Sequence, residues 1–346
     1  MQYDVYAIGN ALVDSEFKVE ESFFQENNIE KGLMTLVEQD QLDDLEKALK
    51  ERSELQARNC GGSAGNSLFA VSSFGGNSFL SCKIASDPDG YFYSKQMNKD
   101  QIHTNRVSSS QTGKTGRCMV MVSPDAERTM HTHLGVSDSI ASCDLQFTAA
   151  KNAKYIYIEG YLVTSPGARA AVIDLKKFAK KNKIKTAMTF SDPAMVEYFS
   201  EEINEVLGEG VDLLFCNEQE LKIWAKAETL ESSLERLKIK AKQFVVTQGS
   251  EGAIIFDGNE LTKIEAHHVR TVDTNGAGDM FAGAMLFGIT HGLSFKQAGD
   301  LASLASSEVV SQFGSRISRE RHLQLLETVK TGISRLGPSI KSSARQ

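Results

Sequence analysis

Cysteine, proline and tryptophan are sparse in this 346-residue chain, which has five, five and one of them respectively. The five cysteines stand far apart and form no CxxC pair or other spacing typical of a metal site. Their odd number also prevents complete pairing within one chain. We therefore expect free thiols, a reducing compartment and a cytoplasmic location.

Long apolar runs and long runs of one charge are missing as well. No stretch approaches the roughly 18 apolar residues of a membrane helix, and the first residues lack the pattern of a signal peptide, so no membrane association is expected. The net charge of -7 is spread over 45 acidic and 38 basic residues without a basic block, which argues against a nucleic-acid partner. An anionic substrate would then need a local site.

The sequence does contain an alternation of apolar strand-like segments and helix-like segments. Hydrophobic residues make up 41% of the chain, enough for one large globular domain with a smaller appendage. The alternation predicts an α/β fold with a parallel sheet covered by helices. The expected strands are 5–8, 79–84, 116–122, 128–134, 155–158, 186–190, 211–216, 244–247 and 253–256, and the expected helices are 39–49, 67–74, 168–181, 200–206, 218–225 and 277–288.

The stretch 269–279 carries the most chemical information. A strand-like run precedes the small residues 276–278 and an apolar helix, so these residues would lie at a helix N-terminus, where backbone N–H groups and the helix dipole favour anions. Asp273 and Asp279 flank them. Phosphoryl transfer explains this arrangement, because an aspartate can accept the proton of the attacking hydroxyl beside an anion-binding turn. A helix start with capping acids is the alternative interpretation.

The segment 273–279, Asp-Thr-Asn-Gly-Ala-Gly-Asp, resembles the Asp-Thr-x-Gly-Ala-Gly-Asp signature of the ribokinase-like, or PfkB, family of sugar and nucleoside kinases. The resemblance implies a three-layer α/β/α domain with a small β-rich lid. It also implies that Asp279 is the catalytic base. The anion hole would be formed by the amides of Gly276, Ala277 and Gly278, with Thr274 beside ATP.

Further segments of the chain resemble the acceptor site of this family. A glycine pair precedes a small-residue helix, and an aspartate follows the first strand, where its two oxygens would grip two sugar hydroxyls. The residues that hold the sugar would be Asp14, Gly61, Gly62 and Asn66. Within the family the match is nearest to the adenosine kinases, in which a flat apolar slot holds the purine. The walls of that slot would be Leu12, Tyr161 and Leu162, unless these are core residues at strand ends.

Two motifs fall on the nucleotide side. Asn217 and Glu220 match an Asn-x-x-Glu motif, which in the family organises water-bound Mg²⁺ near the phosphates, although alone it would be an ordinary capped helix. The segment 247–252 follows a strand and resembles the nucleotide loop, although a hairpin turn would look similar. Its ATP-contacting residues would be Thr247, Gly249 and Gly252.

Charged residues on the expected lid and near the signature have several interpretations. Arg128 either swings over the phosphates when the lid closes or remains a surface arginine. His131 and His133 share a face of one strand but make a poor metal site without a carboxylate or cysteine neighbour. Family members often respond to K⁺, and the resemblance makes Asp273 and Asn275 candidates for a monovalent-cation site.

The combined expectation is a large α/β domain from 1–13, 59–111 and 136–346, with a lid from 14–58 and 112–135. With ATP and Mg²⁺ as cofactors, the protein would phosphorylate the 5'-hydroxyl of a nucleoside, adenosine first, to give AMP and ADP. The alternatives are a ribokinase- or fructokinase-like sugar kinase, an inosine or guanosine kinase, and a non-catalytic nucleoside or nucleotide sensor. Monomer and homodimer both stay open.

Overall fold

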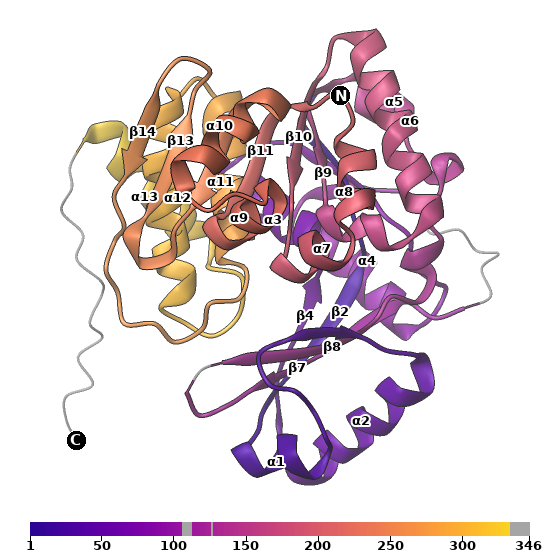
Figure 1. The fold of residues 1–346 in the computed structure, drawn as a ribbon. Coiled ribbons are helices and arrows are strands. Elements are labelled where there is room, and N and C mark those ends of the chain that lie inside the picture. Colours follow the sequence, from indigo (N-terminus) through magenta and orange to yellow (C-terminus); the bar gives the residue numbers. More distant parts are fainter. Residues whose placement is uncertain (106–112, 126, 333–346) are drawn as a thin grey trace.

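The computed structural model describes residues 1–105, 113–125 and 127–332. Its large lobe is built on a nine-stranded sheet in the order β14-β13-β12-β11-β10-β9-β1-β5-β6 (Figure 1). The strands from β12 to β6 in this order pair in parallel, whereas β13 and β14 are antiparallel at one edge. Their bounds are β1 (Tyr3–Ile8), β5 (Ser78–Ser81), β6 (Ile102–Thr104), β9 (Ala153–Ile158), β10 (Lys185–Thr189), β11 (Val211–Asn217), β12 (Ala241–Thr247), β13 (Ala253–Phe256) and β14 (Leu261–Ile264).

Helices cover both faces of this sheet and complete three layers, as predicted (Figure 1). One face packs on α3 (Ser63–Ser73), α4 (Pro88–Lys99), α11 (Ala277–Thr290), α12 (Phe295–Val310) and α13 (Arg319–Thr331). The other face packs on α5 (Phe147–Lys151), α6 (Pro166–Asn182), α7 (Pro193–Tyr198), α8 (Ser200–Leu207), α9 (Glu218–Ala225) and α10 (Leu230–Lys240). Successive side chains of a strand point to opposite faces, so β1 contributes Val5 to the first core and Tyr6 to the second.

A second, five-stranded sheet in the order β3-β8-β7-β2-β4 forms a small lobe beside the carboxyl ends of the parallel strands (Figure 1). Its strands are β2 (Leu12–Lys18), β3 (Met34–Leu36), β4 (Leu55–Gly61), β7 (Gly116–Val122) and β8 (Arg128–His133), and its helices are α1 (Glu21–Glu26) and α2 (Gln39–Arg52). The predicted β-hairpin is confirmed, because β7 and β8 pair antiparallel. The strands arise from the segments expected to form a lid, with β2 and β4 extending beyond them into the large lobe.

One local prediction was wrong. The strand-like run before the signature is not a strand; instead, the amides of Val272 and Asp273 donate to the carbonyl of Val310, at 2.8 and 3.2 Å. The segment 247–252 forms the hairpin turn that was its alternative interpretation, because β12 turns back through a short 3₁₀ helix, η4 (Gly249–Glu251), into the antiparallel strand β13. The other 3₁₀ turns are η1 (Gly135–Ser139), η2 (Ser142–Asp144) and η3 (Gly160–Thr164).

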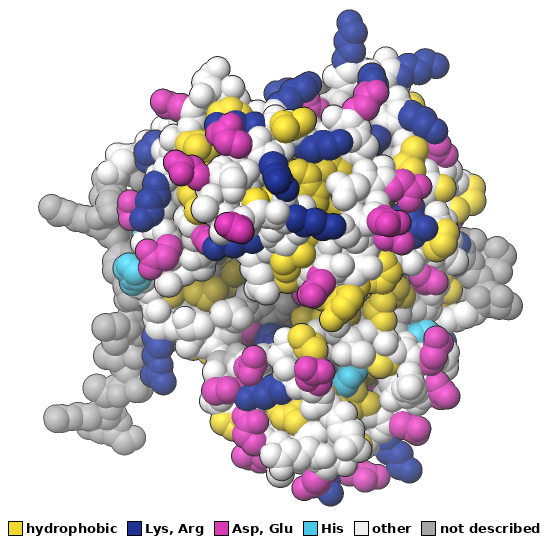
Figure 2. Space-filling model, viewed as in Figure 1, with side chains coloured by type: hydrophobic (Ala, Val, Ile, Leu, Met, Phe, Trp, Pro, Cys, Tyr) yellow, Lys and Arg dark blue, Asp and Glu magenta, His cyan; other side chains and the backbone are white. Residues whose placement is uncertain are grey.

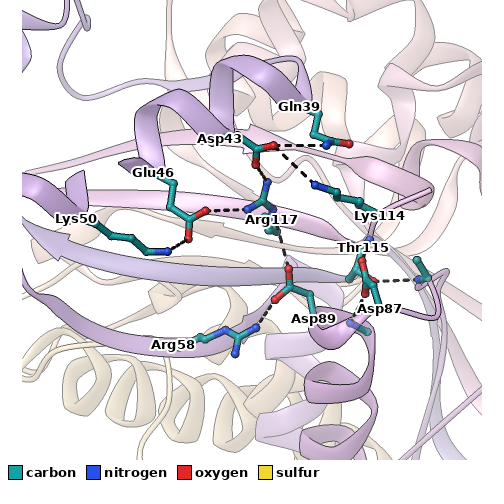
Figure 3. Close-up of polar contacts among 12 residues, drawn as sticks. Gln39, Asp43, Glu46, Lys50, Arg58, Asp87, Asp89, Lys114, Thr115 and Arg117 are labelled. Atoms are coloured by element: carbon teal, nitrogen blue, oxygen red, sulfur yellow. Dashed lines mark hydrogen bonds and ion pairs between the residues drawn. The ribbon is translucent and has the colours of Figure 1, made fainter. Parts of the chain in front are cut away.

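Charged side chains connect the two lobes (Figure 3). Arg117 on β7 contacts Glu46 of α2 at 3.0 Å and pairs with Asp43 of the same helix. On the large lobe, Asp89 of α4 lies 4.0 Å from Arg117 and pairs with Arg58 of β4. The network therefore anchors the small-lobe sheet to α4 at the point where the chain passes between the lobes.

Within the part of the chain that the structure describes, no helix is long and apolar enough to cross a membrane. The same residues include no group of three or more His, Cys, Asp or Glu side chains that could hold a metal ion. His131 and His133 both lie on β8, and the Nδ1 atom of His133 is 3.1 Å from the carbonyl of Val37.

Candidate active site

A cavity of about 580 Å³ lies between the two lobes at the carboxyl ends of the parallel strands. In open α/β sheets ligands bind at this edge, because the loops that leave the strands there converge. Five of the parallel strands contribute lining residues at or just after their ends, namely Asn10, Glu159, Asp192, Asn217 and Thr247. In the space-filling view, hydrophobic side chains gather along the furrow between the lobes (Figure 2).

Asp279 lines this cavity from the first turn of α11. Its Oδ1 accepts a hydrogen bond from the Ser63 hydroxyl at 2.6 Å, and its Oδ2 accepts one from the Asn66 amide at 3.1 Å. Burial raises the pKa of Asp279, while these two hydrogen bonds and the charge of Arg316 oppose the rise. The carboxylate is thus held in one orientation and remains a candidate proton acceptor.

The turn before Asp279 has the geometry of an anion-binding site. Gly276 is the N-cap of α11 with a φ of 74°, and a Cβ there would lie 2.3 Å from the Cβ of Ser315. A Cβ on Gly278 would meet nothing within 4 Å, because this residue borders open cavity. The first turn of a helix leaves its N–H groups without intrahelical acceptors, so they can bind an anion that approaches this close.

The glycine pair at the end of β4 makes room for Asp14. A Cβ on Gly61 would lie 2.1 Å from Oδ1 of Asp14, and a Cβ on Gly62, whose φ is 92°, would lie 2.2 Å from the carbonyl oxygen of Asn10. Both positions therefore require glycine, one for side-chain space and the other for backbone conformation as well. Asp14 and Gly62 line the cavity.

Asp14 is an unusually basic carboxylate. Burial and the charge of Glu16 raise its pKa to about 7, although Arg128 and Arg316 act in the opposite direction. An ionised carboxylate has two acceptor oxygens and can therefore accept hydrogen bonds from two hydroxyls. Asp14 is thus suited to a polyhydroxyl acceptor such as a sugar ring.

Arg128 does not lie over open cavity as an unpaired cation. It is buried at 9% exposure, pairs in a bidentate manner with Asp273, and approaches Glu16 at 3.6 Å. The Asp273 carboxylate also accepts from the amides of Asn275 and Gly314, at 2.9 and 2.8 Å. Arg128 therefore connects the small lobe to the signature segment. Among the described atoms, its Nη1 is buried without a hydrogen-bond partner.

The Asn217–Glu220 motif caps α9. The Glu220 amide donates to Oδ1 of Asn217 at 2.7 Å, and the Asn217 side-chain amide donates to Glu220 at 2.8 Å. Burial, backed by the charge of Asp192, raises the pKa of Glu220 to about 7, although the amide of Asn217 opposes this. Two neighbouring carboxylates and an amide oxygen are hard oxygen donors beside the cavity, so these residues fit a hydrated Mg²⁺ ion.

A second cavity of about 300 Å³ adjoins the first on the side of the β12–β13 turn. Both cavities are lined by Thr247, Thr274, Gly278 and Phe281. Gly249 and Gly252 line only the second one, together with residues of α12. The signature turn thus separates two adjoining spaces, each of a size for a small ligand.

Apolar residues of the small lobe cover one side of the main cavity. The wall that includes the predicted Leu12 and Tyr161 is extended by Met34, Leu36, Met130 and Leu134. The prediction for Leu162 was wrong, because its side chain is 2% exposed and packs in the core beneath the sheet. Tyr161 and Thr164 are the residues of η3 that line the cavity.

Several site residues were missed from the sequence. Ser63 stands inside the glycine-rich segment, and Asp192 lies three residues after the end of a buried strand, so position alone marks both as candidates. Glu159, whose pKa burial raises to about 7, also follows a strand and accepts from the Ala64 amide at 2.8 Å. Arg316 carried no local signal that distinguishes it from other arginines near the C-terminal helix.

Comparisons with known proteins show the family of this chain. Residues 33–321 match the model of the pfkB family carbohydrate kinases. The chain belongs to the PfkB family. PfkB kinases are phosphotransferases that act on hydroxyl groups, so this chain is an enzyme of that class, and its family implies ATP as phosphoryl donor.

Individual relatives include both nucleoside and sugar kinases. The chain is similar to the adenosine kinase from Sinorhizobium meliloti, with 32% identity, a TM-score of 0.87 and coverage of 94% of this chain and 100% of that one. It is equally similar in fold to a probable sugar kinase from Rhizobium etli CFN 42, with 30% identity, a TM-score of 0.87 and coverage of 96% and 99%. An adenosine kinase from Dictyostelium discoideum is 29% identical over 223 residues, which span 59% of this chain and 64% of that one.

Proposed function

We propose that this PfkB kinase transfers the γ-phosphoryl group of ATP to the 5'-hydroxyl of a nucleoside, with adenosine as the preferred acceptor. One observation carries the proposal: Asp279 and the Gly276–Gly278 turn stand where two adjoining cavities meet. An acceptor in the first cavity and ATP in the second would then place the hydroxyl and the γ-phosphoryl group on either side of this turn.

The chemical step follows from these positions. Asp279 accepts the proton of the 5'-hydroxyl, whose oxygen forms a bond to the γ-phosphorus as the bond to the β,γ-bridging oxygen breaks and ADP leaves. The amides of Gly276, Ala277 and Gly278 donate to the oxygens of the transferring group. Mg²⁺, held through water near Asn217, Glu220 and Asp192, would neutralise charge on the ATP phosphates.

The acceptor side supports a nucleoside over a bare sugar. Asp14 and the amide of Gly62 would hold the ribose hydroxyls, because both border the cavity beside Asp279. Leu12, Met34 and Met130 then offer an apolar surface for the base, which a sugar alone would not require. Asn66 was expected to bind the sugar. Its amide already donates to the carboxylate of Asp279, so we propose that Asn66 also orients this catalytic aspartate.

The residues predicted from the sequence to contact ATP are proposed for that role here as well. Thr247, Gly249, Gly252 and Thr274 line the second cavity and would contact ATP. A monovalent-cation site at Asp273 and Asn275 also stays a prediction. The Asp273 carboxylate accepts hydrogen bonds from Arg128 and two backbone amides, so a K⁺ ion there would depend on neighbouring carbonyl oxygens. All five cysteines are free thiols, which supports a reducing, cytoplasmic location.

Replacement of the base tests the proposal. Asp279→Asn preserves the size and the hydrogen-bonding position of the side chain but removes the proton acceptor, so turnover should fall about a hundredfold or more, with little change in nucleoside affinity. ADP release measures the first quantity and calorimetric titration the second. Near-wild-type turnover in this variant would rule out Asp279 as the base and with it the proposed mechanism.

A substrate panel separates the nucleoside kinase from its nearest alternative. The similarity to a probable sugar kinase leaves a sugar acceptor as the second candidate. ADP release should be compared over adenosine, inosine, guanosine, ribose and fructose at equal concentrations. We expect the highest kcat/KM with adenosine. A higher value with ribose or fructose would assign the chain to the sugar kinases, and binding without ADP release would indicate a sensor.

A further inference from the structure

The residues behind Asp279 form a continuous hydrogen-bonded chain. Asn66 donates from Nδ2 to Oδ2 of Asp279, while its Oδ1 faces Arg316. The Nε and Nη2 atoms of Arg316 both lie 3.3 Å from this oxygen. The described hydrogen bonds of Arg316 go to Asn66, Asp100 and Cys60 and not to Asp279, so the influence of its geometry on the base passes through the Asn66 amide.

Arginine imposes a direction on this chain. A guanidinium group carries only donors, so the Asn66 oxygen must face Arg316 and the NH₂ group must face Asp279. If the amide were rotated by 180°, its oxygen would face the ionised carboxylate, where two acceptors repel each other. Arg316 thus selects the amide orientation in which Asn66 stabilises the ionised, proton-accepting form of Asp279.

The guanidinium group is held on every side. Nη1 pairs with Asp100 at the C-cap of α4 at 2.9 Å, and Nη2 donates to the carbonyl of Cys60 at 2.9 Å. Its central carbon lies 4.6 Å from the centre of the Phe69 ring. With 13% of its side chain exposed, Arg316 is fixed by contacts with β4, α3 and α4, which explains how a side chain outside the cavity can hold a group inside it.

Other ionisable groups surround the base. Asp14 on β2, Tyr157 on β9, Glu159 after β9 and Tyr161 in η3 all interact electrostatically with Asp279. Arg316 is the cation whose charge lowers the pKa of Asp279, and it acts on Asp14 in the same sense. Loss of this charge should therefore raise the pH at which the base loses its function.

We propose that Arg316 is a positioning residue for phosphoryl transfer, which orients the Asn66 amide and through it the base Asp279. The inference rests on the function proposed above and extends it to a residue outside the signature segment. It predicts that Arg316 and Asn66 act as one unit, so that their effects on turnover do not add.

A double-mutant cycle tests this coupling. The enzymes to compare are the wild type, Arg316→Gln, Asn66→Ala and the double variant, with kcat, the KM for the acceptor, the pH profile of kcat and the melting temperature measured for each. We expect Arg316→Gln to lower kcat about tenfold or more, to change KM by less than about threefold, and to move the acid limb of the profile to higher pH. In the Asn66→Ala background the same change should lower kcat by less than about twofold.

Two further variants distinguish the effect of Asn66 orientation on turnover from the effects of charge and of general stability. Arg319→Gln removes an exposed arginine from the same part of the chain, whose Nη1 donates to Gln101 at 2.6 Å, and should leave turnover unchanged. Arg316→Lys keeps the charge but loses the planar donors, so kcat should stay low while the acid limb remains close to that of the wild type. It also serves as the test if Arg316→Gln does not fold.

The proposal is overturned if Arg316→Gln or Arg316→Lys turns over like the wild type. It is also overturned if the losses of Arg316→Gln and Asn66→Ala are additive, or if kcat falls only in step with the melting temperature and the pH profile does not move. Asp279→Asn distinguishes the two levels of the argument. An active Asp279→Asn enzyme contradicts the proposed function, whereas an inactive one with a fully active Arg316→Gln enzyme contradicts only the role of Arg316.

Discussion

At the scale of single residues, two glycines shape the acceptor site because they have no side chain. The Gly61 position would place a Cβ 2.1 Å from Oδ1 of Asp14, while the Gly62 position would place one 2.2 Å from a backbone oxygen. The first conflict involves a carboxylate of the site, and the second involves the main chain. Substitution of the two neighbours should therefore have different consequences.

Gly61→Ala should act on substrate binding. The new methyl group displaces the Asp14 carboxylate, so we expect the KM for the acceptor to rise about tenfold or more with a small change in stability. The comparison variant is Gly62→Ala, which must also adopt a φ of 92° and should lose about 1–3 kcal/mol of unfolding free energy. Steady-state kinetics and urea denaturation of both variants check this. Equal KM values in Gly61→Ala and the wild type would contradict a role of Asp14 in acceptor binding.

At the scale of elements, the position of the small lobe depends on polar contacts at its junction with α4. The larger apolar cluster of the small lobe consists mainly of residues from β2, α1, α2 and β7, and is separate from the two cores of the large lobe. Arg117, with 12% of its side chain exposed, lies among Asp43 and Glu46 of α2 and Asp89 of α4 (Figure 3). This arginine balances three carboxylates that belong to two helices, one in each lobe.

Arg117→Gln should loosen this junction. Three carboxylates would lose their common cation, and we expect the unfolding free energy to fall by about 1–2 kcal/mol, because the group is partly screened by solvent. Hydrogen exchange in α2 should accelerate. Salt at about 0.5 M should reduce the difference in unfolding free energy between the variant and the wild type, because it screens charge interactions. Asp89→Asn, which removes only the α4 contact, should have a smaller effect on α2. Unchanged exchange in α2 would show that the network does not hold the helix.

At the scale of the whole molecule, buried ionisable groups set the pH range of stability. The pKa values of Asp14, Glu159 and Glu220 are each raised to about 7, mainly by burial. These carboxyls bind protons more readily in the folded chain, so their contribution to stability increases as the pH falls through 7. His322 acts in the opposite direction. Burial lowers its pKa to about 4, and within the described residues its Nε2 atom has no hydrogen-bond partner.

His322→Phe isolates that contribution. The unfolded chain protonates His322 near its ordinary pKa of 6.5, while the folded chain resists protonation until about pH 4. The unfolding free energy should therefore fall between these values, by on the order of 3 kcal/mol for this group. Phenylalanine should fit beside Phe69 and Phe74, which contact the ring of His322 edge-on. Urea denaturation at pH 7 and pH 4.5 should show a smaller loss for the variant, and equal losses would contradict the prediction.

The alternation of strands and helices between residues 155 and 225 and the position of the signature at a helix start were determined by the sequence itself. Asp279 and the turn before it are contiguous, so the local backbone of one turn and one helix start suffices to place them together. Strands 211–216 and 244–247 were likewise recognisable from their apolar runs, because buried strands of a parallel sheet are continuously hydrophobic.

Only the tertiary structure decided which distant residues complete the site. Arg316 is 250 positions from Asn66, and Arg128 is 145 positions from Asp273, so neither pair leaves a periodic or local signal in the sequence. Leu162 shows the same limit, since an apolar residue after a strand can face a cavity or the core with equal propensity. Such contacts depend on how the helices and strands pack against one another across the whole fold, and neighbouring residues in the sequence do not determine this packing.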